Sequence, residues 1–138
     1  MLAGRYTLLE QGAADELLPI ALEQARSVVA AAVFNSGLLA HEDVPDTATY
    51  NYRPASPDVL ERARLLASAC REHGATLPAA AIQFPLRHPA VASVVVGMRS
   101  PEEVQHNIAA HAQHVPDELW ADLERRGLLR RVCLRHPQ

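Results

Sequence analysis

The apolar positions of the chain gather in three short runs, with segments of helical spacing between and after them. The runs are Arg5 to Leu9, Ser27 to Phe34 and Ser93 to Val96. Short, continuous apolar runs are typical of strands that are covered on both faces of a parallel sheet. We therefore predict three buried strands and expect the run at Ser93 to Val96 to be central in the sheet.

Five segments have the spacing or the end signals of helices. The predicted helices are Ala13 to Gln24, a helix opened by Ser56, Pro57 and Asp58 and ended by Gly74, a short helix from Pro78 to Phe84 ended by Pro85, Pro101 to about Ala112, and a last helix that carries Leu119, Trp120 and Leu123 and stops at Gly127. Trp120 is expected to pack in the core. The resulting order of elements, with strands and helices in alternation, predicts an α/β fold with a parallel sheet.

Three strands make a thin sheet for this pattern. Each predicted strand expects neighbours on both sides, and a sheet of three such strands leaves open edges. We therefore expect the chain to be part of something larger, with its edges covered by a partner chain or by further parts of the same fold.

The stretch from Ser93 to Asn107 joins an apolar strand to a polar helix start. Gly97 permits a turn at unusual dihedral angles, and Ser100 is suited to cap the helix that follows. Glu103 is placed to reach back to the Ser100 amide as a capping box. A strand, glycine turn and helix N-terminus in this order commonly bind an anion, although a well-capped turn with no ligand explains the same residues.

Composition narrows the class of protein. The chain has 138 residues, of which 49% are hydrophobic and 21% charged, and its net charge is −3 with a pI near 6.1. It lacks the basic patch expected of a nucleic-acid-binding protein. It also lacks an apolar segment of the roughly 18 residues that a membrane span needs, and a signal peptide. We expect a globular cytoplasmic protein.

Cysteine and histidine give no sign of redox or metal chemistry. Cys70 and Cys133 belong to no CxxC pair and are expected to be reduced thiols. His106, His111 and His114 lie on or near one predicted helix, but their spacing puts no clean pair on one face. We predict no metal site.

Four blocks of the sequence, "RYTLLEQGAADELLPIA", "SVVAAAVFNSGLLA", "YNYRPASPDVLERARLL" and "AAAIQFPLRHPAVASVVVGMRSPEEVQHN", resemble in order and spacing the C-terminal half of the aldo/keto reductases. Within this family the chain resembles the bacterial dehydrogenases of L-fucose and D-threo-aldoses. The resemblance runs from about Gly4 to Leu129. It implies that residues 1–138 form part of a (β/α)8 TIM barrel, with strands six, seven and eight and their helices, in an oxidoreductase that transfers hydride between NAD or NADP and an aldose or aldehyde.

The resemblance also implies roles for individual residues. Tyr6 would stack on the nicotinamide ring, although a strand residue buried in the barrel mouth is the alternative. Tyr50 and Tyr52, in the long polar stretch from His41 to Arg53, would border the substrate or would simply be surface aromatics. The residues that match the family's cofactor cradle are Phe34, Asn35, Ser36, Gly37 and Leu38 after the second strand, and Gly97, Met98, Arg99, Ser100, Glu103 and Asn107 after the third.

Two departures from the family pattern bear on this reading. Many members that use NADP have Arg and Glu where this chain has Glu103 and His106. A carboxylate repels a 2′-phosphate, which favours NAD over NADP, whereas Arg99 could still bind a phosphate. The family's catalytic Asp, Tyr, Lys and His come from the first half of its barrel. No position of this chain matches them, and all 13 basic residues are Arg.

We therefore predict a chain that carries cofactor-binding elements and no catalytic residues. His88 is expected to end a helix and not to replace the catalytic histidine. The small-molecule substrate would be handled only by the complete enzyme. The alternatives are a non-catalytic half-barrel that pairs with a missing N-terminal half or with itself, and a truncated reading frame.

Overall fold

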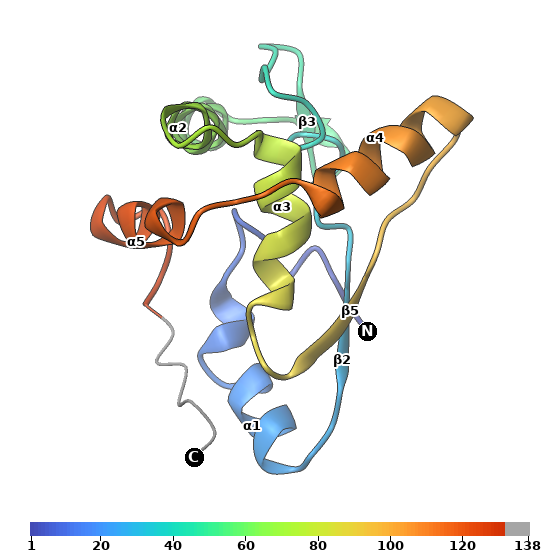
Figure 1. Ribbon diagram of the computed structural model, residues 1–138, viewed down its shortest axis with the longest axis vertical. Coiled ribbons are helices and arrows are strands. Elements are labelled where there is room, and N and C mark those ends of the chain that lie inside the picture. The colour runs from blue at the N-terminus through green and yellow to red at the C-terminus, as the bar shows by residue number, and fades with distance from the viewer. Residues whose placement is uncertain (132–138) are drawn as a thin grey trace.

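The computed structural model describes residues 1–131, and three parallel strands form its main sheet (Figure 1). They are β1 (Leu2–Ala3), β2 (Val28–Ala31) and β5 (Val91–Val95), in the order β1-β2-β5. Ala31 is level with Ala3 on one side and with Val95 on the other. The carboxyl ends of all three strands therefore lie at the same edge of the sheet.

The helices lie in layers beside this sheet. In Figure 1, α3 runs beside β2 and β5, α2 and α5 lie beyond α3, and α4 projects from the carboxyl edge of the sheet. The remaining bounds are η1 (Gly12–Ala14), α1 (Leu17–Glu23), β3 (Thr49–Tyr50), β4 (Arg53–Pro54), α2 (Pro57–Glu72), α3 (Leu77–Leu86), α4 (Pro101–Ala112) and α5 (Asp117–Arg125). The alternation of strands and helices predicted from the sequence is confirmed, but its first strand lies at Leu2–Ala3 and not at Arg5 to Leu9. The small β3–β4 hairpin begins within the predicted loop from His41 to Arg53 and ends at Pro54.

The first predicted strand, Arg5 to Leu9, is wrong. The strand ends at Ala3, and Gly4 turns the chain with a φ of +66°. The Thr7 hydroxyl then accepts hydrogen bonds from the Leu9 and Glu10 amides at 3.1 and 3.0 Å, which closes a local turn. Tyr6, Thr7 and Leu8 are buried in this turn. The apolar run therefore marks burial without marking a strand.

The second and third strands differ from the prediction in length and place. β2 covers only the first half of Ser27 to Phe34, because Ala32 has a φ of +54° and the chain turns there. β5 is an edge strand and β2 is the central one. Ala92, Ser93 and Val95 are exposed, so β5 is not covered on both faces. A run of β-branched residues predicts a buried strand, but the neighbours that bury it come from elsewhere.

The helix ends follow local signals in most cases. Ser56 caps α2 by accepting a hydrogen bond from the Val59 amide at 3.4 Å, and Gly74 follows the helix with a φ of +71°. The first predicted helix is shorter and divides into η1 and α1. Thr76 caps α3. Pro85, which was predicted to end this helix, lies in its last turn, and the helix continues to Leu86.

The core lies between α3, α2 and α5. Leu66, Leu119 and Leu123 are fully buried there, and Trp120 is 4% exposed, which confirms that it packs in the core. Cys70 is a free, buried cysteine, whereas Cys133 lies outside the described residues. Within residues 1–131, no three His, Cys, Asp or Glu side chains are placed to share a metal ion. Over the same range, no helix is both long and apolar enough to cross a bilayer.

Candidate cofactor site

The carboxyl edge of the sheet carries two turns, which we call the β2 turn (residues 32–38) and the β5 turn (residues 96–100). Because Ala31 and Val95 are level in the sheet, both turns begin at the same height on neighbouring strands. The β5 turn leads directly into α4. A crevice outside the carboxyl ends of parallel strands is the place where α/β proteins commonly bind ligands.

The β5 turn ends in a capped helix N-terminus. The Ser100 hydroxyl accepts a hydrogen bond from the Glu103 amide at 3.2 Å, as predicted. The Glu103 carboxylate, however, accepts from the Arg99 amide at 2.6 Å, one residue earlier than the Ser100 amide that a capping box predicts. Ser100 is extended, with φ −146° and ψ 158°, as is usual for an N-cap residue. A negative charge therefore lies beside the turn in which an anion would bind.

The β2 turn has an unusual backbone and a buried polar group. Asn35, Ser36 and Gly37 have φ values of +49°, +61° and +88°. Asn35 is 5% exposed, and its Oδ1 has no hydrogen-bond partner in the part of the chain that the structure describes. Leaving a buried acceptor unpaired costs about 1–3 kcal/mol. This acceptor is suited to a ligand group that donates a hydrogen bond, such as an amide or a hydroxyl.

The other residues of the β2 turn hold it in place. The Leu39 amide donates to the Phe34 carbonyl at 3.0 Å, and Leu38 is buried. The Thr49 hydroxyl donates to the Ser36 carbonyl at 3.4 Å and so ties the β3–β4 hairpin to the turn. This contact was not predictable from the sequence, because a single threonine in a long polar stretch gives no signal of its partner.

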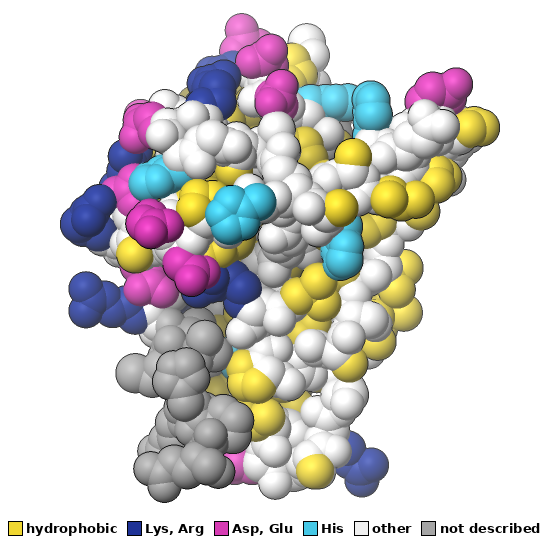
Figure 2. Space-filling model, in the orientation of Figure 1, with side chains coloured by type: hydrophobic (Ala, Val, Ile, Leu, Met, Phe, Trp, Pro, Cys, Tyr) yellow, Lys and Arg dark blue, Asp and Glu magenta, His cyan; other side chains and the backbone are white. Residues whose placement is uncertain are grey.

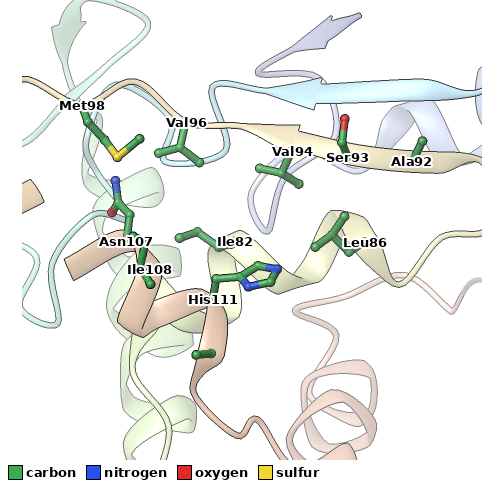
Figure 3. A pocket seen from close by; sticks show the side chains of 11 residues that line it. Ile82, Leu86, Ala92, Ser93, Val94, Val96, Met98, Asn107, Ile108 and His111 are labelled. Atoms are coloured by element: carbon green, nitrogen blue, oxygen red, sulfur yellow. The ribbon is translucent and has the colours of Figure 1, made fainter. Parts of the chain in front are cut away.

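Two pockets meet at Asn107 on α4. One has a volume of about 500 Å³ and lies between α3, β5 and α4, and Figure 3 shows Val96 and Met98 near Asn107 at one end of it. Its lining is largely apolar. The other has a volume of about 390 Å³ and is lined in part by His41, Glu42, His106 and Asn107. The second pocket is the more polar and is better suited to a base or a sugar.

Tyr6 lies in the core. It is 2% exposed, and its ring centroid is 5.0 Å from that of Phe84 and 5.9 Å from that of His88. Burial raises the pKa of Tyr6 to about 12, although the Arg87 charge acts in the opposite direction. At 2% exposure neither ring face is open to a ligand, and Tyr6 lies in a turn and not in the strand that the sequence predicts. Its stacking on the nicotinamide stays a prediction. His88 follows α3, and its Nδ1 accepts from the Ala90 amide at 3.1 Å.

The two loop tyrosines are placed differently from each other. Tyr50 is in β3 and packs against the core with part of its side chain, whereas Tyr52 is 97% exposed at the tip of the hairpin with a φ of +63°. The structure therefore does not bring them together as a pair. Their role at a substrate stays a prediction.

Solved structures similar to this chain define the class of fold. An aldo-keto reductase from Bacillus halodurans, in its holo form, matches 99% of this chain and 45% of its own chain with a TM-score of 0.68 and 24% identity. The glycerol dehydrogenase of Gluconobacter oxydans matches 95% of this chain and 42% of its own, with a TM-score of 0.67 and 18% identity. The fold is therefore the α/β fold of the aldo-keto reductases, which is of the TIM-barrel type.

The sequence comparisons agree. The model of the aldo/keto reductase family matches residues 1–126, and the chain belongs to this family. It is 46% identical over 129 residues to the D-threo-aldose 1-dehydrogenase of a Pseudomonas species and 42% identical over 129 residues to the pyridoxal 4-dehydrogenase of Microbacterium luteolum. Each match covers 94% of this chain but only 39% and 37% of the relative. The chain thus spans about two fifths of the length of these curated relatives.

Proposed function

We propose that this chain is the cofactor-binding part of an NAD(P)-dependent oxidoreductase and that it corresponds to strands six to eight, the C-terminal portion, of the family's barrel. The observation that supports this proposal is that a glycine turn and a capped helix N-terminus lie at the carboxyl edge of the sheet. They are level with a neighbouring turn that buries the Asn35 Oδ1, which has no hydrogen-bond partner within residues 1–131. In TIM barrels, phosphate is frequently bound by the loops after strands seven and eight with a helix N-terminus. The β2 and β5 turns would fill these places.

In this proposal, the residues of the two turns and of α4 bind different parts of the cofactor. The amides of Gly97 to Ser100 would bind the phosphate on the adenosine side of the cofactor, as helix N-termini bind anions. The β2 turn would lie along the pyrophosphate, and Asn35 would accept a hydrogen bond from a hydroxyl or amide of the cofactor. Asn107, at the meeting point of two pockets, would contact the adenosine. Tyr6 would stack on the nicotinamide only if it left its present packing.

The substrate class is a small aldose or aldehyde, because the similar sequences include a D-threo-aldose and a pyridoxal dehydrogenase. The complete enzyme would transfer a hydride between the cofactor and the carbonyl or alcohol carbon. A tyrosine that exchanges the proton at neutral pH needs charged neighbours. Tyr6 is instead buried with a raised pKa, and the chain contains no lysine. The catalytic groups would therefore come from another part of the barrel.

NAD is the preferred cofactor in this proposal. The Glu103 carboxylate lies within 2.6 Å of the Arg99 amide, so a 2′-phosphate entering the β5 turn would meet a negative charge. NAD has a hydroxyl at this position and avoids the repulsion.

The experiment is an NMR titration of the isotopically labelled chain with NADH and with NADPH. NADH is expected to bind weakly and to shift the amide resonances of Gly97, Arg99 and Ser100 at lower concentration than NADPH does. Glu103→Gln is expected to reduce the difference between the two nucleotides. Glu61→Gln, an exposed substitution on α2, is the matched control. The cofactor proposal is wrong if neither nucleotide moves these resonances, and the preference for NAD is wrong if NADPH binds more tightly.

A second candidate function is that of a non-catalytic half-barrel that pairs with another chain. It is favoured by the second edge of β5, which pairs with no strand among residues 1–131. A half-barrel of this kind would associate with its partner without binding nucleotide. This function would be favoured over the first proposal by an assembled complex in which NADH does not shift the amide resonances of the β5 turn.

A further inference from the structure

α4 is held mainly at one end within the part of the chain that the structure describes. Ala110, near the C-terminal end, is the only residue of this helix that is buried. Residues 101–106, in its first half, are all exposed. In Figure 1 this first half projects away from α3. The direction of the helix therefore depends on contacts at its C-terminal end.

The Gln83 side chain of α3 makes such contacts. Its Nε2 donates hydrogen bonds to the carbonyl oxygens of Gln113 at 2.8 Å, Ala110 at 3.0 Å and His111 at 3.2 Å. These carbonyls lie in the last turn and at the C-cap of α4, where a helix leaves its carbonyl groups without partners of its own. The amide nitrogen has two hydrogens, which the three carbonyls share. Gln83 thus caps the end of α4 from a neighbouring helix.

A second bridge joins the same two helices. The side-chain oxygen of Gln113 accepts hydrogen bonds from the Thr76 amide at 2.9 Å and from the Thr76 hydroxyl at 3.0 Å. Thr76 is the N-cap of α3, and Gln83 follows it by two helical turns, which is about 10 Å along the axis. Two attachment points at this separation on α3 resist rotation of α4 about either one of them.

We propose that Gln83 is a positioning residue, whose hydrogen bonds to the end of α4 set the direction of this helix and so place the β5 turn beside the β2 turn. This inference rests on the proposed function. From Ala110 to Pro101 the helix rises by about 13.5 Å, so a change of about 10° in its direction would move the first turn by about 2 Å. A binding site built from two turns needs its parts held within about 0.5 Å. Gln83 would therefore affect cofactor binding without touching the cofactor.

The test compares Gln83→Leu with Gln83→Lys. Leucine has a similar length but donates no hydrogen bond, whereas the lysine ammonium group has N–H donors for the same carbonyls. Residual dipolar couplings of the labelled chain without nucleotide measure the direction of α4 relative to α3. We expect Gln83→Leu to change this direction and Gln83→Lys to keep it close to that of the parent. Gln24→Leu, the same substitution at the exposed C-cap of α1, is the matched control.

Two results of this comparison overturn the proposal. The first is an unchanged direction of α4 in Gln83→Leu. The second is an equal change in Gln83→Lys, because the packing of the side chain and not its hydrogen bonds would then hold the helix. The couplings of α2 and α5 show in the same spectra whether a variant is folded. If Gln83→Leu does not fold, Gln83→Asn replaces it, since its amide is one methylene group too short for these hydrogen bonds.

Titration with NADH adds a measurement that depends on the cofactor site. Gln83→Leu is expected to need about fivefold more NADH than the parent for the same shift of the Gly97 and Arg99 amide resonances, the size of effect that one net hydrogen bond gives. Gln24→Leu is expected to titrate like the parent. Equal NADH affinity in a Gln83→Leu chain whose α4 has changed direction overturns the proposal.

The outcomes separate this inference from the cofactor proposal. If α4 changes direction in Gln83→Leu and the parent does not bind NADH, the positioning of the β5 turn by Gln83 is supported and the cofactor proposal is wrong. If the parent binds NADH and α4 keeps its direction in Gln83→Leu, the cofactor proposal stands and the role of Gln83 is wrong.

Discussion

The surfaces on two sides of the molecule differ in the kind of side chain that they expose. Around α2 and α5, charged side chains pair across the surface: Asp122 accepts hydrogen bonds from His73 at 3.0 Å and from Arg125, and Arg126 bridges Asp122 and Glu72. Figure 2 shows charged side chains over α2 and α5, on the side opposite the apolar one that covers α4 and β5. Paired charges at a surface gain little from being covered by another chain. Exposed apolar side chains, and a strand edge that is unpaired within residues 1–131, would be stabilised by burial.

The two C-terminal helices show the same contrast. α5 buries Leu119, Trp120, Asp122 and Leu123, whereas α4 buries only Ala110. α4 is held at its C-terminal end, where the Gln83 side chain donates to the carbonyls of Ala110 at 3.0 Å and Gln113 at 2.8 Å. Its N-terminal end, with the β5 turn, projects from the sheet (Figure 1). The candidate cofactor site is thus built on the open side.

The largest expected effect compares truncations on these two helices. Leu119→Ala removes a fully buried side chain of α5 and is expected to lower the free energy of unfolding by about 2–5 kcal/mol. Ile108→Ala removes a side chain of α4 that is 64% exposed and is expected to change it by no more than about 0.5 kcal/mol. Urea denaturation measures both. Equal losses would mean that the α4 side is covered in solution.

The second prediction concerns the stability of the folded chain at acidic pH. Hydrogen bonds from His73, and then from the Arg126 and Arg125 side chains, lower the pKa of Asp122 from 3.8 to about 2, although its burial opposes the shift. Because the folded pKa lies below the unfolded one, the stability that Asp122 contributes is present above about pH 4 and is lost as the pH falls toward 2.

Asp122→Asn is therefore expected to lower stability at pH 6 and to flatten its dependence on pH between 4 and 2. Asp43→Asn is the control, because Asp43 is fully exposed and its contact with Arg71 is 3.5 Å. Chemical denaturation at a series of pH values measures the effect. If Asp122→Asn leaves the acid transition unchanged, this ion-pair cluster does not stabilise the packing of α2 against α5.

The third prediction compares the same substitution on the two sides. Ser56→Ala and Ser100→Ala each remove a helix cap worth about 1 kcal/mol. Ser56→Ala is expected to lower global stability, because α2 is part of the core. Ser100→Ala is expected to speed hydrogen exchange in the first turn of α4 and to leave global stability almost unchanged. A global loss in both variants would contradict the open character of α4.

The smallest expected effect is on the reactivity of a buried thiol. Burial raises the pKa of the Cys70 thiol to about 12, more than the helix backbone and Arg71 lower it. In a Cys133→Ser background, Cys70 is expected to resist alkylation at pH 8 until the protein unfolds, since the thiolate is the reactive form. A cysteine introduced by Ile108→Cys is expected to react at once. Rapid labelling of Cys70 in the folded chain would show that the α2 side opens.

Helix starts and turns were largely predictable from the sequence, because their signals act within a few residues. Ser56 and Ser100 each accept a hydrogen bond from an amide three residues later, and Gly74 takes the positive φ that it alone tolerates well. The strand from Arg5 to Leu9 was wrong for the opposite reason. Its apolar pattern records burial, and burial in a turn closed by Thr7 has the same pattern as burial in a strand.

The family, the alternation of strands and helices and the capped start of α4 could be predicted from the sequence alone, because each depends on patterns of residues that are near one another in the chain. Only the folded chain shows that β2 and not β5 is central and that Tyr6 packs against Phe84 and His88. Sheet order and ring packing depend on residues far apart in the chain. Only the assembled fold brings such residues into contact and decides which faces stay open.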